Sequence, residues 1–321
     1  MTRILAAAIQ MNSQPDLERN MEQVGVDVAR AAREGARLIA LPENFAYLGS
    51  ELGKHRRADR IAETVLERIP VLAREFGVYL LAGGFPVRTG LPEPTDSVGR
   101  MVAREPDNPR SRTFNRAIVA GPSGGIIAQY DKIHLFDITL SDQEQYRESA
   151  LVAPGRPEAV VCDLMLDDNG AGGNQRDPAD ENDGNNEHGG KSENGGNGGI
   201  VRLGLSICYD LRFPELYRRL SEQGADVLCV PAAFTRPTGA AHWETLLRAR
   251  AIENTCYVIA PAQTGLHGTK RTTHGHSLII DPWGTVLADA QKKPGVIYAE
   301  IDTGHIQEIR RKLPSLRHRK L

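Results

Sequence analysis

The segment from Ile200 to Arg219, which reads IVRLGLSICYDLRFPELYRR, constrains the fold more than any other part of the chain. Its first eight residues are apolar and β-branched, which predicts a buried strand, and Pro214 opens a stretch with helical period. Cys208 lies where the strand gives way to the helix. Backbone N–H groups on such a turn favour the thiolate of a cysteine. The segment therefore predicts an α/β fold with a candidate nucleophile, although a small buried cysteine explains the pattern equally well.

Composition narrows the class of protein. A chain of 321 residues with 40% hydrophobic content can bury a large core, and a formal charge of -2 gives no case for nucleic acid as a partner. No apolar run reaches the roughly 18 residues that span a membrane. The cysteines are widely separated and have neither zinc-ligand spacing nor the density of a disulfide framework. We therefore expect a cytoplasmic protein without a metal; these cysteines are Cys162, Cys208, Cys229 and Cys256.

Strands and helices alternate along the chain, which predicts a single layered sandwich domain over residues 1–301. Residues 167–199 interrupt it with Gly, Asn, Asp and Glu and lack large apolar residues, so we expect a disordered acidic insert. A partner-binding segment is the alternative for this insert. Residues 302–321 are rich in Arg and Lys and are expected to form a C-terminal arm. Helices are expected at 17–34, 58–76, 214–223 and 242–254, and polar loops at 89–112, 142–148 and 264–273.

Two further charged residues lie near predicted strand ends. Glu43 follows the apolar run Leu38 to Leu41, where Pro42 stops strand pairing, and Lys132 lies in an expected strand from Ile126 to Leu135. Each alone is explained by exposure to water. If both meet Cys208, the carboxylate can take the thiol proton while the ammonium and the backbone N–H of Tyr209 stabilise an oxyanion.

The motifs LPENF around Glu43, YDKIHLF around Lys132 and GLSICYDLRFPE around Cys208 resemble the nitrilase superfamily of carbon-nitrogen hydrolases. The resemblance covers nearly the whole chain apart from the acidic insert. It implies an α-β-β-α sandwich, a catalytic Glu43, Lys132 and Cys208, no cofactor, and assembly into a homodimer or a higher homo-oligomer. A second family glutamate, which positions the lysine and the leaving group, maps onto Glu148.

Within this superfamily, residues 232–253, 257–265 and 275–284 look like the amidase branch that contains deaminated glutathione amidase and omega-amidase. The resemblance implies hydrolysis of a small carboxylated amide through a thioester on Cys208, with deaminated glutathione as one such substrate. A nitrilase, an omega-amidase or an N-carbamoyl amino acid hydrolase with the same triad remains an alternative. A non-catalytic binding protein that keeps the fold is a third reading.

Four residues are candidates for substrate contacts. Arg212 has the planar fork that pairs with a carboxylate, although a structural salt bridge fits it as well. Phe45, Phe234 and Thr235 follow predicted strands and are expected to line the pocket, with the hydrophobic core as the alternative for the aromatic rings. His134 and His276 lie in strand-like runs and are expected to be structural.

Overall fold

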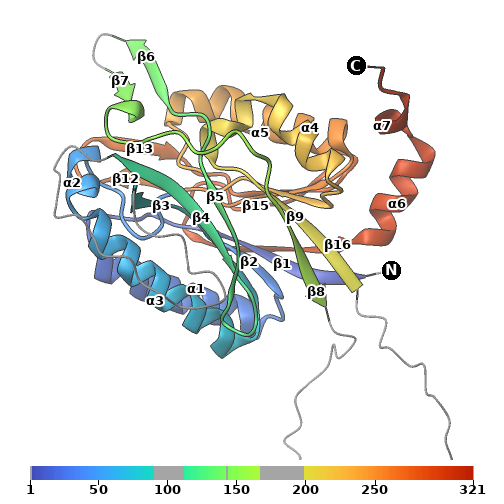
Figure 1. The fold of residues 1–321 in the computed structure, drawn as a ribbon, viewed down its shortest axis with the longest axis horizontal. Coiled ribbons are helices and arrows are strands. Elements are labelled where there is room, and N and C mark those ends of the chain that lie inside the picture. Colours follow the sequence, from blue (N-terminus) through green and yellow to red (C-terminus); the bar gives the residue numbers. More distant parts are fainter. Residues whose placement is uncertain (1, 90–111, 142–143, 167–198, 321) are drawn as a thin grey trace, which may run out of the picture.

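The computed structural model describes residues 2–89, 112–141, 144–166 and 199–320. The predicted disordered insert lies outside these residues apart from its last position, Gly199, and so does most of the loop expected at 89–112. Within the described residues the chain forms two six-stranded sheets and two small hairpins. Helices cover the outer face of each sheet, so the layers run helix, sheet, sheet, helix (Figure 1). The α-β-β-α sandwich expected from the sequence is confirmed.

The first sheet has a parallel centre and antiparallel edges. Its strand order is β16 (Gly295–Asp302), β1 (Arg3–Gln10), β2 (Leu38–Ala40), β3 (Tyr79–Arg88), β4 (Thr113–Ala120) and β5 (Ile126–Asp131). Strand β1 shows why both faces are apolar: Ala6 and Ala8 pack toward the second sheet, whereas Ala7 and Ile9 pack under the helices. Side chains alternate between faces along a strand, so a continuous apolar run belongs between two layers.

The second sheet is built in the same way around three parallel strands. Its order is β15 (Val286–Asp289), β14 (Leu278–Ile280), β11 (Tyr257–Ala260), β10 (Val227–Cys229), β9 (Gly199–Leu205) and β8 (Val161–Leu166). The carboxyl ends of the parallel strands in both sheets open toward the same region of the molecule. In α/β sheets, ligands bind beyond such strand ends.

The helices follow from their apolar faces and their caps. Helices α1 (Leu17–Arg33) and α3 (Ala58–Phe76) cover the first sheet, and α4 (Pro214–Glu222) and α5 (Arg236–Asn254) cover the second (Figure 1). The Asp16 side chain caps α1, and Gly77 ends α3 with a φ of 60°, a left-handed conformation that favours glycine. Helix α5 begins six residues before the expected start at His242, because Pro237 is tolerated in the first turn of a helix.

Three short polar segments differ from expectation. The supposed loop at 264–273 is a hairpin of β12 (Thr264–His267) and β13 (Arg271–His274), and the connection around 142–148 contains β6 (Asp137–Ser141), β7 (Glu144–Arg147) and the 3-10 helix η1 (Glu148–Ala150). Helix α2 (Glu51–Arg56) has no counterpart among the expected elements. The elements in these three segments are too short and too polar to show a hydrophobic period. Tertiary contacts, rather than a local sequence pattern, stabilise them.

The C-terminal residues lie beside the second sheet. They contain α6 (Thr303–Lys312), whose Ile306 and Ile309 are buried, and α7 (Ser315–His318) (Figure 1). The Asp302 carboxylate caps α6 by accepting hydrogen bonds from the first backbone N–H groups. None of the helices in the described ranges combines the length and the apolar composition that crossing a membrane requires.

Candidate active site

Cys208 lies on a strained turn between β9 and α4, at the start of the 3-10 helix η2 (Cys208–Arg212). Its φ of 49° is left-handed, a region that residues other than glycine rarely occupy. A hydrogen bond of 2.9 Å from its own N–H to the Pro231 carbonyl ties the turn to the end of the neighbouring strand. Strain of this kind persists where the surroundings fix it and is typical of functional sites.

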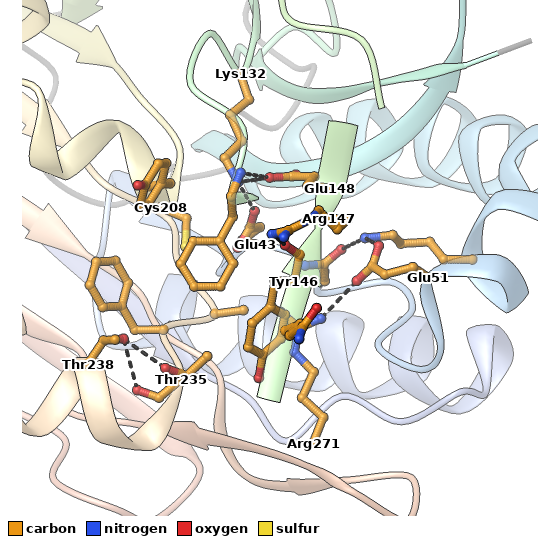
Figure 2. A pocket seen from close by; sticks show the side chains of 17 residues that line it. Glu43, Glu51, Lys132, Tyr146, Arg147, Glu148, Cys208, Thr235, Thr238 and Arg271 are labelled. Atoms are coloured by element: carbon orange, nitrogen blue, oxygen red, sulfur yellow. Dashed lines mark hydrogen bonds and ion pairs between the residues drawn. The ribbon is translucent and has the colours of Figure 1, made fainter. Parts of the chain in front are cut away.

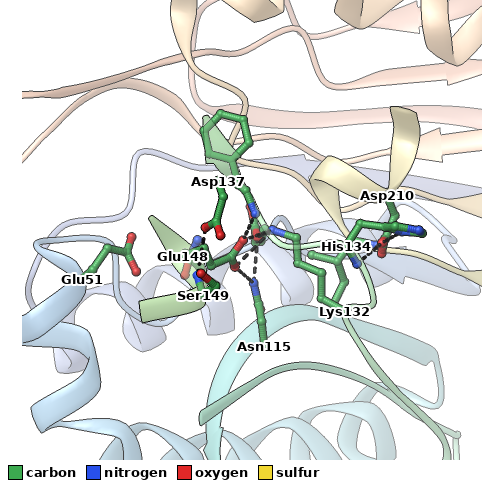
Figure 3. A network of polar contacts seen from close by, with 12 residues as sticks. Glu51, Asn115, Lys132, His134, Asp137, Glu148, Ser149 and Asp210 are labelled. Atoms are coloured by element: carbon green, nitrogen blue, oxygen red, sulfur yellow. Dashed lines mark hydrogen bonds and ion pairs between the residues drawn. The ribbon is translucent and has the colours of Figure 1, made fainter. Parts of the chain in front are cut away.

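Asp210 holds this turn against the segment that carries Lys132. Its carboxylate is fully buried and accepts hydrogen bonds from the Ile207 N–H at 2.9 Å and the Tyr130 hydroxyl at 2.7 Å. It also accepts from the backbone N–H of His134 at 3.1 Å and lies 2.8 Å from the His134 ring nitrogen Nδ1 (Figure 3). Asp210 therefore links the two segments rigidly. His134 is structural, as expected, because its ring pairs with Asp210.

Lys132 lies between two glutamates in the buried interior. Strand β5 ends one residue before Lys132, earlier than the sequence suggests, and the side chain then points at the carboxylates. Its Nζ is 3.3 Å from Oε1 of Glu43 and 2.8 Å from Oε2 of Glu148 (Figures 2 and 3). Only 2% of the lysine side chain is exposed. A buried ammonium needs partners of opposite charge, and these two carboxylates supply them.

Asn115 on β4 completes this cluster and has no counterpart among the residues expected from the sequence. Its amide Nδ2 donates to Glu43 at 2.9 Å and to Glu148 at 3.2 Å. Glu148 also accepts from the Phe136 backbone N–H at 2.7 Å. Each carboxylate is therefore held by at least two donors. The arrangement fixes both glutamates relative to Lys132.

The electrostatics of the site shift the pKa values of Glu43 and Cys208 in opposite directions. Burial raises the pKa of the Glu43 carboxyl, but the charges of Lys132, Lys54 and Arg271 together outweigh burial and hold that pKa below the ordinary value. Burial and the neighbouring Glu43 together raise the pKa of the Cys208 thiol well above its usual range. The expectation that the turn favours a thiolate is therefore wrong for the resting protein. A neutral thiol beside an ionised carboxylate, to which it is hydrogen bonded, is the resting state.

A single cavity contains these groups. Glu43, Lys132, Glu148 and Cys208 line it together, and so do three of the residues expected from the sequence, Tyr209, Phe234 and Thr235 (Figure 2). In the described part of the chain, no hydrogen bond from the Tyr209 backbone N–H occurs, so this donor is available. The cavity thus brings together a thiol, two carboxylates, a buried ammonium and the residue that carries this backbone N–H.

Two of the expected substrate contacts lie elsewhere. Phe45 is fully buried in the core beneath the first sheet, where its ring meets Phe85 edge-on at 6.4 Å between centroids. Arg212 lies outside the cavity lining, 3.3 Å from the Nδ1 atom of His242, with its guanidinium over the rings of Tyr209 and Phe234. Packing in the core explains the position of Phe45 without a ligand.

The cavity also contains charged and polar residues that sequence reasoning missed. Glu51 and Lys54 come from α2, Tyr146 comes from β7, and Arg271 comes from β13. All of them lie on the short polar elements that the sequence suggested were loops or did not mark at all. No group of three or more His, Cys, Asp or Glu side chains in the described ranges is arranged to hold a metal ion.

Comparison with known proteins agrees with this geometry. A model of the carbon-nitrogen hydrolase family matches residues 5–311. The deaminated glutathione amidase of Synechocystis sp. is 45% identical over 315 residues, which are 98% of this chain and 97% of that protein. The protein of the same name from Bos taurus is 36% identical, over 98% of this chain and 82% of its own length.

Solved structures with the same fold extend the comparison. The Caenorhabditis elegans NitFhit protein superposes with a TM-score of 0.76 at 33% identity, over 99% of this chain and 65% of that one. Saccharomyces cerevisiae Nit3, a member of branch 10 of the nitrilase superfamily, gives a TM-score of 0.73 at 25% identity, over 99% and 97%. Fold, cavity and sequence similarity over nearly the full length thus agree, and this chain belongs to the carbon-nitrogen hydrolase family of the nitrilase superfamily.

Proposed function

We propose that the protein is a thiol-dependent amidase that hydrolyses a small carboxylated amide through a thioester on Cys208. The observation that carries this proposal is the buried contact of Lys132 with Glu43 and Glu148 in the cavity that Cys208 lines. Two carboxylates hold the Lys132 ammonium in one position inside the protein. Its charge is therefore already in place to stabilise an oxyanion. The geometry thereby supplies each group that acyl transfer to sulfur requires.

The first half of the reaction forms the acyl-enzyme. Glu43 accepts the thiol proton of Cys208 while the sulfur attacks the amide carbon. The carbonyl oxygen becomes an oxyanion, stabilised by Lys132 Nζ and the Tyr209 N–H. The protonated Glu43 then gives its proton to the nitrogen, so that the C–N bond breaks and the amine leaves as a neutral molecule. The thioester remains on Cys208.

The second half returns the enzyme to its resting state. Glu43, again a carboxylate, takes a proton from a water molecule that attacks the thioester carbon. The same donors stabilise the second oxyanion. The C–S bond then breaks, the sulfur recovers the proton from Glu43, and the acid is released. We assign Glu148 the task of holding Lys132 in place, since it accepts two of the hydrogen bonds that the ammonium donates, at 3.2 and 2.8 Å.

Relatives guide the choice of substrate. Two proteins named deaminated glutathione amidase match nearly the whole chain, which supports deaminated glutathione as a substrate. Hydrolysis of a nitrile, of the monoamide of a dicarboxylate, as in an omega-amidase, or of an N-carbamoyl amino acid uses the same three residues. These reactions remain the alternatives.

The proposal is tested by assaying wild-type protein on deaminated glutathione, a dicarboxylate monoamide, a nitrile and a carbamoyl amino acid. We expect product from the first two and, at most, slow turnover of the others. Cys208→Ala is expected to abolish turnover, whereas Cys162→Ala, a buried cysteine of β8, serves as the matched control and keeps it. Full amide hydrolysis by Cys208→Ala would refute the assignment of Cys208, and the absence of turnover by wild-type protein on all four compounds would favour a fold retained for binding.

We also propose the setting in which this activity operates. Residues 1–301 form the hydrolase domain, interrupted by 167–199, and residues 302–321 form the C-terminal arm. The four cysteines are free and buried, in keeping with a reducing cytoplasm. The family resemblance supports a homodimer or higher homo-oligomer, which light scattering of the purified protein tests. A monomeric mass would exclude it.

A further inference from the structure

The charged groups in the cavity fall into two clusters (Figure 2). The first consists of Glu43, Glu148 and Lys132 around Cys208. The second consists of Glu51, Lys54 and Arg271 and lies at a different end of the cavity. The mechanism proposed above uses the first cluster only. The second cluster therefore calls for a separate explanation.

The second cluster carries one positive charge more than its acid neutralises. Glu51 is its single carboxylate and is shared: Oε2 lies 2.9 Å from Lys54 Nζ, and Oε1 lies 2.9 Å from Arg271 Nη1. Burial raises the pKa of the Glu51 carboxyl, but the charges and hydrogen bonds of Lys54 and Arg271 outweigh burial. The pKa falls from 4.5 to about 2. Glu51 is therefore ionised at neutral pH. The second cluster therefore keeps one unit of positive charge at its own end of the cavity, whereas the first cluster, with two carboxylates and one ammonium, carries one unit of negative charge.

Arg271 has donor capacity left over. Its Nε is buried and has no hydrogen-bond partner among the described residues, although its guanidinium lines the cavity. A buried polar atom without a partner calls for an explanation, and a ligand bound beside this guanidinium is one. The guanidinium fork matches the two oxygens of a carboxylate. Its charge also acts on Glu43 and Cys208, so both clusters lie within reach of one small molecule.

We propose that Arg271, held in place by Glu51, binds the carboxylate of the substrate while Cys208 attacks the amide. This inference rests on the proposed function and replaces Arg212 as the candidate for carboxylate recognition. Arg147 also lines the cavity, but it is exposed and donates to the Tyr146 carbonyl and the Thr139 hydroxyl, and within the described part of the chain it forms no ion pair with a carboxylate. Arg271 is the arginine that the fold orients in advance.

The test compares two amides of matched length, 4-carbamoylbutanoate and pentanamide, which differ in the terminal carboxylate. Wild-type protein is expected to prefer the carboxylate by roughly 10- to 100-fold in kcat/KM, the usual range for a hydrogen bond to a charged group. Arg271→Gln is expected to remove this preference, mainly through a higher KM for 4-carbamoylbutanoate, so that the two amides are hydrolysed with similar kcat/KM. Arg271→Lys keeps part of the preference because it keeps the charge. Arg248→Gln, a change at the surface of α5, is the matched control.

The outcomes separate this inference from the proposed function. If wild-type protein hydrolyses neither amide nor deaminated glutathione, the proposed function fails. If it hydrolyses both test amides equally well, or if Arg271→Gln and Arg271→Lys keep the full preference, the role of Arg271 is refuted and the proposed amidase stands. Loss of the preference in Arg212→Gln alone would return the role to Arg212. Circular dichroism and urea denaturation show that each variant is folded.

Discussion

The hairpin that carries Arg271 is anchored by a buried histidine whose protonation should weaken the fold. His267 on β12 is 2% exposed and lies between two oxygens, 2.7 Å from the Ser13 carbonyl and 2.6 Å from the Thr273 hydroxyl. Since a carbonyl only accepts, Nδ1 carries the proton and Nε2 accepts from Thr273. Burial, reinforced by the charge of Arg271, lowers the pKa of His267 from 6.5 to about 4.

The magnitude follows from this shift. In the unfolded chain the histidine takes up its proton near pH 6.5, whereas in the folded protein it does so only near pH 4. Between these values the unfolded state binds more protons, so acid favours unfolding. The stabilisation is complete above the unfolded pKa and is lost as pH falls toward the folded one. One unit of pKa corresponds to about 1.4 kcal/mol. Protonation of His267 is therefore expected to lower the free energy of unfolding by about 2 kcal/mol at pH 5 and by about 3 kcal/mol at pH 4, relative to neutral pH.

Urea denaturation of wild-type protein and His267→Gln, measured from about pH 8 to about pH 4, isolates this contribution. The variant starts less stable, and the difference between the two is expected to shrink by about 3 kcal/mol across the range. His318→Gln, at an exposed position of α7, controls for the loss of a titrating group. A difference that stays constant with pH would refute the reasoning. So would an equal change in the His318 variant.

Three further predictions concern the site and the insert. Asp210→Asn leaves at least one buried donor without an acceptor and should lower the free energy of unfolding by about 2 to 4 kcal/mol, measured in urea, with the exposed Asp163→Asn as control. Glu148→Gln should lower kcat by about 10²-fold or more with little change in KM, because Lys132 loses its closest charged partner, and an unchanged kcat would contradict this; Glu158→Gln is its control. Deletion of residues 167–199 should leave amidase activity intact, and its loss would assign the insert a functional role.

Long helices and strands with an apolar face could be predicted because their hydrophobic period is visible in the local sequence. The helix at 58–76 has the bounds expected from its periodicity, and the strand before Cys208 is buried from Leu203 to Leu205, although Ile200 and Arg202 nearer its start are exposed. The small elements were not, since α2 and the hairpin of β12 and β13 are stabilised by distant contacts. His267 of β12, for example, bonds to the carbonyl of Ser13, which lies 254 positions away in the sequence, and to the hydroxyl of Thr273 on β13.

The site divides in the same manner. Cys208, Glu43 and Lys132 could be found because each stands near the end of an apolar strand, where a charged or nucleophilic residue is unusual. Arg271 and Asn115 could not, because nothing in their local sequence distinguishes them from solvated loop or strand residues. Only the fold brings Glu51 beside Arg271. It also brings Glu43 and Glu148 beside Asn115.

Mass spectrometry of the protein quenched with acid during turnover of an amide tests the central claim most directly. The account predicts a mass increase equal to the acyl group, located by peptide mapping on Cys208, in wild-type protein and in Cys162→Ala. Slower deacylation raises the trapped fraction, so poor substrates are the best probes. An acyl group on another residue, or efficient amide hydrolysis by Cys208→Ala, would contradict the account.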